Sequence, residues 1–287
     1  ERGRSRELGV TTRAGQRRTG LAVLLLPPMA WLVIAYLGSL AVLLVSAFWS
    51  TNSFTGAVVR SFTTDNIVRV LTDPVFRTAT VRTVAVALTV TVICAVLAVP
   101  LALYMAKIAG PGVRLALVVA VTTPLWASYL VKAYAWRMMF SPEGPLSWTT
   151  GYTPGYGLAA TIVTLTYLWL PYMVIPVFAA FDRVPDTLID ASSDLGASSW
   201  TTLRSVLAPM VFPGVVAGSI FTFSLSLGDY IAVQIVGGKT QLLGNIIYGQ
   251  LVTANNQPLA AALSLIPLFA IVAYLLAMRR TGALESL

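Results

Sequence analysis

The stretch "DASSDLGASSWTTLRSVLAPMVFPG", Asp190 to Gly214, is polar and compatible with helix, whereas the sequence on either side of it is apolar. The chain has 287 residues, of which 57% are hydrophobic and only 10% are charged. Soluble domains carry about 25% charged residues, so this composition indicates a membrane protein. A polar stretch of this length therefore needs an explanation.

Charge-free intervals divide the chain into lengths that can cross a bilayer. A spanning helix needs about 20 mostly apolar residues, and five of the six longest charge-free intervals exceed that length. The shorter interval, residues 115–131, reaches it if Lys132 extends its charged end toward the headgroups. We therefore expect an all-α polytopic membrane protein with six transmembrane helices. The expected spans are residues 21–48, 80–106, 114–138, 157–181, 208–235 and 258–278.

Basic residues predict the orientation of these spans. Six of the 19 Lys and Arg residues lie in the first 18 positions, before the first span, and cytoplasmic segments of membrane proteins are rich in Lys and Arg. We expect both termini in the cytoplasm, a basic segment at 1–20 and a transmembrane domain at 21–287. An export signal is the alternative for "RRTG" and the apolar run after it. That run is too long for a signal core, and five more spans follow.

The opening stretch falls in the cytoplasmic loop between the fourth and fifth spans, residues 182–208, which we call the polar elbow. Gly196 interrupts its helical pattern, a second helical piece begins near Ser198, and Pro209 marks the return to the membrane. Two short helices that meet at a glycine predict a projecting bend. The alternative is a solvated loop whose acids only keep it soluble. Acids recur at every fourth residue, which gives one acidic stripe on a helix: Asp182, Asp186, Asp190 and Asp194.

The spacing inside the polar elbow resembles a loop of ABC importer permeases. Their pattern is Glu-Ala-Ala, three residues, Gly, nine residues, Ile, one residue and Leu-Pro. Here Asp190-Ala191-Ser192 is followed by three residues, Gly196, nine residues, Val206, one residue and Ala208-Pro209. Every spacing matches, although four of the residue types are replaced by similar ones.

Four longer stretches resemble the first permease of the spermidine/putrescine type: "PLWASYLVKAYAW" (124–136), "LWLPYMVIPVFAAF" (168–181), "FPGVVAGSIFTFSLSLGDY" (212–230) and "IVGGKTQLLGNIIYGQ" (235–250). The resemblance implies a type I ABC importer permease fold in a bacterial cytoplasmic membrane. It implies polyamine import from an extracytoplasmic substrate-binding protein. The implied partners are a second homologous permease, two cytoplasmic ABC ATPases that bind ATP and Mg, and membrane lipid, with no nucleic acid.

In that family the loop is a coupling helix that docks in a groove of the ATPase. The resemblance places the coupling role on Asp186, Asp190, Ala191, Ser192, Asp194, Gly196 and Pro209. The chain itself lacks a phosphate-binding loop, which needs Gly, four residues and Gly-Lys-Ser/Thr. "GGKT" at 237–240 imitates its end, but residue 233 is Val. We expect a non-catalytic subunit that binds no cofactor.

Candidate pathway residues lie in the outer halves of the spans. Asp229 is the one acid inside or at the edge of the outer half of an expected span, where a carboxylate either lines a water-filled cavity or extends to the interface. Aromatic faces attract organic cations, and the alternative for such rings is anchoring at the membrane surface. The aromatic candidates are Trp126, Tyr129, Tyr167, Trp169 and Tyr172. Lys132, Arg137 and Lys239 near the outer mouth oppose a cationic cargo.

Other functions receive less support from the sequence. The chain has no histidine and a single cysteine, Cys94, inside the second span, so we expect no metal site and no catalytic site. The same machinery with sulfate, ferric iron or another organic ion as cargo is the nearest alternative. An ion-coupled secondary transporter is a more distant one, because no internal repeat with interrupted helices is visible. A short amphipathic helix capped by Thr64 or Asp65 is expected in the first outer loop.

Overall fold

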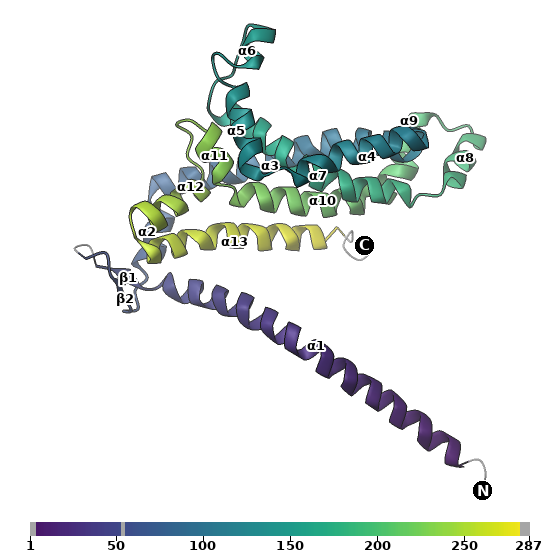
Figure 1. Cartoon of the computed structure of the whole chain (residues 1–287), viewed down its shortest axis with the longest axis horizontal. Helices are drawn as coiled ribbons and strands as arrows, with labels where there is room; N and C mark the ends of the chain where they lie inside the picture. The colour runs from purple at the N-terminus through teal and green to yellow at the C-terminus, as the bar shows by residue number, and fades with distance from the viewer. Residues whose placement is uncertain (1–3, 53–54, 282–287) are drawn as a thin grey trace.

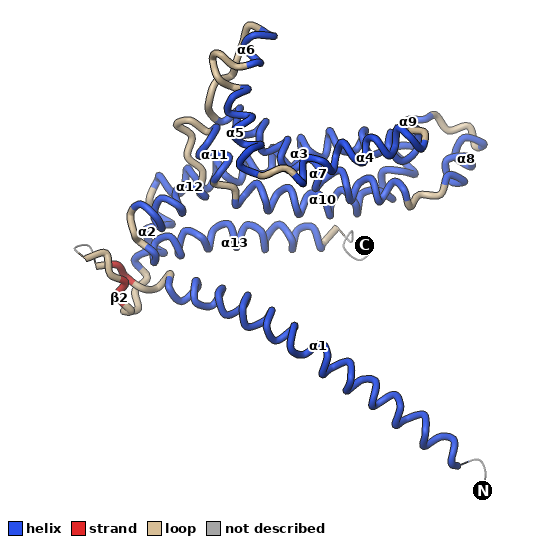
Figure 2. Tube along the Cα trace, viewed as in Figure 1, coloured by secondary structure: helices blue, strands red, loops and turns tan. Residues whose placement is uncertain are grey.

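The computed structural model describes residues 4–52 and 55–281, and the side chains of those ranges from residue 24 onward. Figure 2 shows helix along almost the whole described chain and strand only in one short pair. The long helices are α1 (Arg4–Ser46), α3 (Pro74–Leu103), α4 (Pro111–Trp126), α5 (Tyr129–Met139), α7 (Leu158–Asp182), α10 (Ala208–Gly228) and α13 (Gln257–Arg279). The short helices are α2 (Asp65–Thr72), α6 (Pro145–Thr150), α8 (Asp186–Asp194), α9 (Ser199–Thr202), α11 (Ile231–Val236) and α12 (Leu243–Tyr248). The π-helical turns are η1 (Tyr104–Ile108), η2 (Leu203–Leu207) and η3 (Gly249–Thr253), and strands β1 (Ser50–Thr51) and β2 (Val58–Val59) pair antiparallel.

Three helices, α3, α7 and α10, form the centre of the bundle and share its largest hydrophobic core (Figure 1). Glycines let α10 lie close to α7. A Cβ at Gly214 would lie 2.7 Å from the Pro176 carbonyl oxygen, and one at Gly218 would lie 2.6 Å from Met173 Sδ. Small residues at such contacts allow two membrane helices to approach closely.

Five described helical segments are long and apolar enough to cross a membrane, and a sixth span results if one bent pair of helices is counted. Helix η1 prolongs α3, and α9 and η2 join α10, so two of these segments contain several elements. The helical architecture agrees with the expected class of fold. The expected boundary between residues 20 and 21 falls inside α1, and the side chains of the basic segment 1–20 lie outside the described ones.

Two of the expected spans are broken. The third, expected over 114–138, divides into α4 and α5, which meet at 100°. The backbone is extended at Ala127 and Ser128, which ends the helical hydrogen bonding after Pro124 has already removed one donor. The fifth, expected over 208–235, breaks at Asp229, where the backbone is also extended. The sequence did not predict the 100° bend in the third span.

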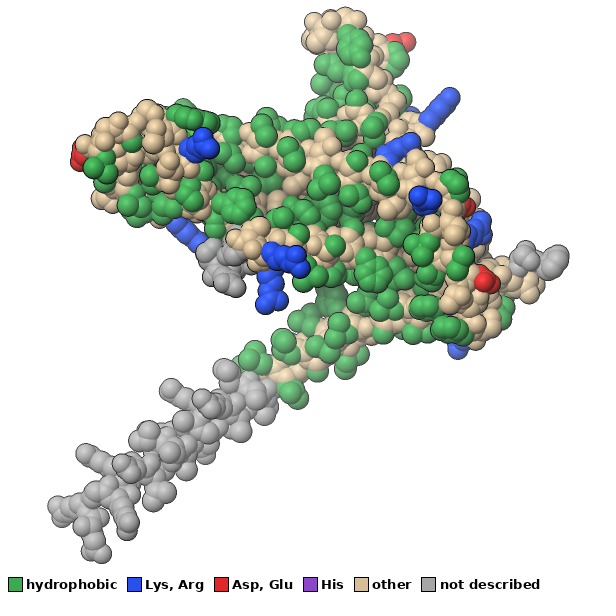
Figure 3. All heavy atoms as spheres, turned by 180° about the vertical axis from the view of Figure 1, so that it is seen from behind, with side chains coloured by type: hydrophobic (Ala, Val, Ile, Leu, Met, Phe, Trp, Pro, Cys, Tyr) green, Lys and Arg blue, Asp and Glu red, His purple; other side chains and the backbone are tan. Residues whose placement is uncertain are grey.

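The peripheral helices leave much apolar surface exposed. Helix α13 lies along the bundle, whereas α1 diverges from it (Figure 1), and none of the apolar window in Leu24–Ser46 is buried within this chain. Hydrophobic side chains cover most of the long surface in Figure 3, and acidic ones are visible only near its ends. The start of α1, the end of α13 and helix α8 all lie toward the same end of the molecule (Figure 1).

The loop after α1 carries the short helix α2 that the sequence predicted, beginning at Asp65. Its predicted cap is wrong, because the Thr64 side chain accepts no hydrogen bond from the helix. The hydroxyl of Thr63 accepts one from the Asp65 N–H instead, at 3.2 Å. Helix α2 buries Val70 against Phe76 and the start of α13, so this loop is packed on the bundle.

Candidate functional site

The polar elbow consists of two arms joined by a tight turn. Helix α8 forms the first arm, and α9, η2 and α10 form the second as one continuous helical path. Gly196 has a φ of 77°, the left-handed conformation that glycine adopts most readily. The Ser198 hydroxyl caps α9 by accepting from the Thr201 N–H, and Ser192 and Thr202 share a hydrogen bond of 2.8 Å between the arms. The predicted bend at Gly196 and the start near Ser198 are confirmed.

The tip of the polar elbow is exposed and partly apolar. The exposed fraction is 89% for Leu195 and 68% for Trp200. Asp190 and Asp194 are exposed as well, and neither forms an ion pair with any residue the structure describes. Large apolar side chains beside unpaired acids are typical of a surface that a partner protein covers. The coupling roles of all seven residues named from the resemblance, Ala191, Ser192 and Pro209 among them, stay predictions.

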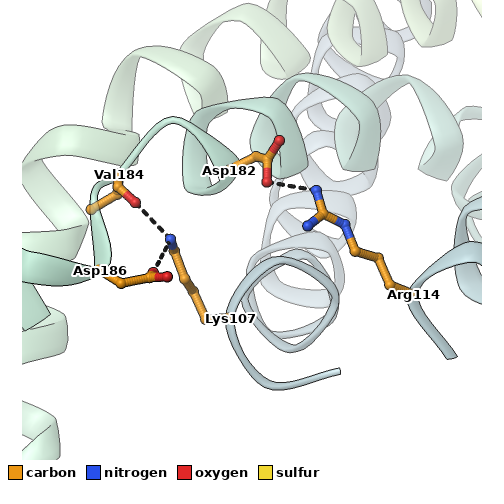
Figure 4. Close-up of polar contacts among 5 residues, drawn as sticks. All are labelled: Lys107, Arg114, Asp182, Val184 and Asp186. Carbon is orange, nitrogen blue, oxygen red and sulfur yellow. Dashed lines mark hydrogen bonds and ion pairs between the residues drawn. The ribbon is translucent and has the colours of Figure 1, made fainter. Parts of the chain in front are cut away.

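The four acids do not form one helical stripe. Helix α7 ends at Asp182 and α8 begins at Asp186, because Pro185 between them has an extended backbone and no N–H to donate. Both acids have cationic partners inside the chain, which the sequence had not predicted (Figure 4). Arg114 lies 2.5 Å from Asp182, and Lys107 lies 2.7 Å from Asp186. Basic residues in the preceding loop on the same side of the membrane were the only signal for these pairs.

A second site lies where the two broken spans meet. The Tyr129 hydroxyl, at the start of α5, donates a hydrogen bond to the Asp229 carboxylate at the end of α10. The same carboxylate accepts from the Ala232 N–H at 2.9 Å, which satisfies one of the free donors at the start of α11. A hollow of about 290 Å³ opens beside this contact, and its lining includes Trp169 and Gly228. The site thus places one acidic residue and three aromatic residues, Tyr129, Trp169 and Tyr230, around one space.

Asp229 is 8% exposed, because other parts of the chain cover it. The structure brings only some of the aromatic candidates to it. The ring centroids of Tyr129 and Trp169 are 6.0 Å apart, and Tyr172 lies 5.8 Å beyond Trp169. Trp126 and Tyr167 are not among the residues that line the hollow. Trp126 is 90% exposed, and Tyr167 packs edge-on against Trp136.

The basic residues near this site are engaged with backbone carbonyls. Lys132 donates to the Pro124 carbonyl at 2.9 Å, across the break between α4 and α5. It therefore does not stretch toward the headgroups, because a carbonyl left free by the break is closer. Arg137 donates to the Ile235 carbonyl at 2.7 Å and lies over the ring of Tyr156. These two cations stabilise the broken segments.

The family model described as "Binding-protein-dependent transport system inner membrane component" matches residues 53–279. The chain belongs to this family, whose members are the permease subunits of ABC importers and multi-pass proteins of the inner membrane. Such a permease is a non-catalytic subunit, and a separate ATPase hydrolyses ATP. The expectation of a permease of this type is confirmed, and the ion-coupled alternative is excluded.

Three curated relatives extend this assignment. The chain is 39% identical to the inner membrane ABC transporter permease protein YdcU of Escherichia coli, over 93% of this chain and 91% of the relative. It is 29% identical to the spermidine/putrescine transport system permease protein PotB of Salmonella typhimurium, over 85% and 87% of the two chains. It is 31% identical to the molybdenum transport system permease protein ModB of Mycobacterium bovis, over 70% and 79%.

The fold also matches a solved structure, that of a bacterial alginate ABC transporter in complex with an alginate pentasaccharide-bound periplasmic protein. The TM-score is 0.69, and the match covers 96% of this chain and 97% of the other. Sequence identity is 16%, so the likeness supports the fold alone. The broken third and fifth spans therefore belong to a chain with the general architecture of an importer permease.

Proposed function

We propose that this chain is one of two permease subunits in an ATP-driven importer of polyamines. In this assembly a second, similar permease completes the pathway, two ATPases bind from the cytoplasm and an external binding protein delivers the cargo. Both termini and the polar elbow lie on the cytoplasmic side, where six basic residues in the first 18 positions favour the N-terminus. The assignment of this chain as a permease subunit agrees with the family to which it belongs.

The polar elbow is the observation that carries this proposal. It projects at one end of the bundle and exposes Leu195 and Trp200 beside Asp190 and Asp194 (Figure 1). An ATPase surface with a matching groove would bury the two apolar side chains, and cations in it would pair with the acids. Because the second arm continues into α10, a displacement of the tip reaches a central helix of the bundle directly.

The hollow beside Asp229 supports an amine as cargo. A carboxylate attracts an ammonium group, and the faces of Tyr129 and Trp169 attract it further. Asp229 accepts hydrogen bonds from neutral donors and forms no ion pair with any described residue, so no described Lys or Arg competes with a cationic cargo for it. The 29% identity to a spermidine/putrescine permease points the same way.

Reconstitution of the complete importer tests this proposal. We expect proteoliposomes that contain both permeases and the ATPases to take up labelled spermidine or putrescine only with ATP and the binding protein. Asp229→Asn should lower this uptake, since the amide keeps the hydrogen-bonding shape and removes the charge. Polyamine uptake that is unaffected by Asp229→Asn, or absent in the wild type, would contradict the assignment of cargo.

An oxyanion such as sulfate or molybdate is the second candidate cargo. The 31% identity to a molybdenum permease favours it, and so does a hollow of about 390 Å³ lined by Arg82 and Lys239. Labelled sulfate and molybdate in the same proteoliposomes separate the two candidates. If either anion accumulates and polyamine does not, the chain belongs to an anion importer. The proposed docking of the ATPase on the polar elbow would then be unchanged.

A further inference from the structure

The two arms of the polar elbow are attached to the bundle in different ways. The second arm passes from α9 through η2 into α10 without interruption. The first arm, α8, is separated from α7 by a non-helical step at residues 183–185. The Arg183 N–H still donates to the Ala179 carbonyl, but Pro185 has an extended backbone and no N–H, so the helix does not continue into α8. Helix α8 therefore needs another attachment if its displacement is to reach the spans.

Two cations hold the junction between α7 and α8, and one of them, Lys107, contacts α8 itself (Figure 4). Lys107, in η1, donates to the Asp186 carboxylate at 2.7 Å and to the Val184 carbonyl at 2.6 Å. Arg114, in the first turn of α4, donates to the Asp182 carboxylate at 2.5 Å. The contacts therefore bracket the non-helical step, with one acid on the α7 side and the other on the α8 side. We call these two cations and their partners the ionic clamp.

The burial of Lys107 makes its contact more than a surface ion pair. Its side chain is 11% exposed, whereas that of Asp186 is 79% exposed. A cation withdrawn from water needs compensation from hydrogen-bond acceptors, and both of its acceptors belong to the polar elbow. Arg114 is held from a second direction as well, since its guanidinium lies 5.0 Å from the centre of the Phe178 ring on α7.

We propose that Lys107 and Arg114 are positioning residues: Lys107 transmits the displacement of α8 to the α3–η1 helix, and Arg114 links the end of α7, to which α8 is joined, to α4. The inference rests on the proposed docking of an ATPase on the polar elbow. Through Lys107 the first arm moves with the second span, and through Arg114 the end of α7 moves with the third span, while the second arm moves with α10. An ATPase that displaces the tip thus acts on both sides of the central bundle.

The first test measures coupling in the reconstituted importer. We expect the double variant Lys107→Met, Arg114→Met to insert, to bind the ATPases and to hydrolyse ATP. The amount of solute transported per ATP should fall about five-fold or more, the lower end of coupling effects between sites. Arg183→Met is the matched control, because Arg183 is an exposed cation next to Asp182 that belongs to neither ion pair. A double variant with wild-type yield per ATP would overturn the proposal.

A charge exchange separates transmission from a simple loss of folding. Arg114→Asp alone should uncouple the importer, and adding Asp182→Arg should restore the yield by re-forming the pair with the charges reversed. Failure of the second change to restore coupling, in a protein with unchanged thermal unfolding, would also overturn the proposal.

A distance measurement distinguishes failure of the ionic clamp from failure of the proposed cargo. Spin labels at Ser193→Cys on α8 and Leu115→Cys on α4, in a Cys94→Ala background, report the separation of the two helices in the assembled complex. We expect one narrow distance that is the same without nucleotide and with ATP, whatever solute is carried. The double Met variant should broaden or shift this distance on ATP binding. Equal ATP responses with and without the clamp cations would contradict their transmitting role.

Discussion

Gly196 holds the turn of the polar elbow in a conformation that other residues adopt at a cost. Its φ of 77° lies in the left-handed region, and its N–H donates to the Ser193 carbonyl at 2.9 Å. A side chain there would meet no atom within 4 Å, so backbone strain alone sets the effect of a substitution. This conformation costs a residue with a Cβ about 1–2 kcal/mol, and asparagine tolerates the left-handed conformation better than most other residues. Proline cannot adopt it and has no N–H.

A graded series at Gly196 is therefore expected. Gly196→Asn should retain most ATP-driven uptake, Gly196→Val should retain less, and Gly196→Pro should abolish both uptake and co-purification of the ATPase. Membrane insertion, measured by the amount of folded chain extracted from the membrane, should not change. Full transport by Gly196→Pro would show that this turn has no part in coupling.

Tyr129 is the second single residue for which we expect a measurable effect, through the hydrogen bond that its hydroxyl donates. It donates to a carboxyl group that is 8% exposed, and leaving a buried acceptor without its donor costs about 1–3 kcal/mol. Tyr129→Phe should lower the free energy of unfolding by about that amount, because the carboxylate keeps its burial and loses one donor. Denaturant titration in detergent measures the change.

Tyr134→Phe is the matched control for this substitution. Tyr134 lies on the same helix, α5, and is exposed, so its hydroxyl faces the surroundings of the chain. Removing that hydroxyl should leave the unfolding midpoint unchanged. Equal effects of the two substitutions would show that the contact between the broken spans contributes nothing particular.

At the scale of elements, the close contact between α7 and α10 depends on glycines in α10, which have no side chain. Gly214 faces Pro176 and Ala180, where a Cβ would lie 2.7 Å from a carbonyl oxygen and 2.6 Å from another Cβ. Gly214→Val should force the helices apart and destabilise the protein by about 1–3 kcal/mol, as overpacking does. Thermal unfolding checks this, with Gly38→Ala in α1 as the control, since nothing lies within 4 Å of the added atom. A Gly214→Val protein as stable as that control would refute the close packing.

The same scale shows what the sequence predicts and what it does not. Charge-free length predicted where each apolar span lies, because membrane crossing constrains length and polarity. It did not predict the 100° bend between α4 and α5, because a bent pair and a straight helix have the same composition. At this bend Lys132 donates to the Pro124 carbonyl that the break leaves free, a contact that hydropathy does not contain.

At the scale of the whole molecule, the spacing of residues in the sequence predicted the turn at the tip of the polar elbow. It did not predict the ion pairs that connect the polar elbow to the bundle. The turn at Gly196 is local, and a motif of fixed spacing describes it fully. The partners in the ionic clamp, by contrast, are separated by 68 and 79 residues along the chain. Their pairing follows from how α3, α4 and α7 pack, which no local pattern records. Likewise, the hydrogen bond between Tyr129 and Asp229 requires the break between α4 and α5 to lie beside the break between α10 and α11.

The positions of the polar elbow, the end of α13 and α6 in the fold predict which side of the membrane each of them faces. The polar elbow and the end of α13 lie toward one end of the bundle, and α6 and the β1–β2 pair lie away from it (Figure 1). Single cysteines report the side, because Cys94 is buried and reacts poorly. Ser193→Cys and Thr281→Cys should react with a membrane-impermeant maleimide only after the membrane is opened, whereas Thr149→Cys should react in intact cells.

Assembly with the ATPase refines this experiment. Ser193→Cys lies on α8, so bound ATPase should protect it in opened membranes, while Thr281→Cys beyond α13 should stay reactive. The protection should disappear in the Gly196→Pro variant, because the arms then no longer present the tip. Labelling of Ser193→Cys in intact cells would place the polar elbow outside, where no ATP-hydrolysing partner could reach it. The three labels thus decide orientation and docking together, without reference to the cargo.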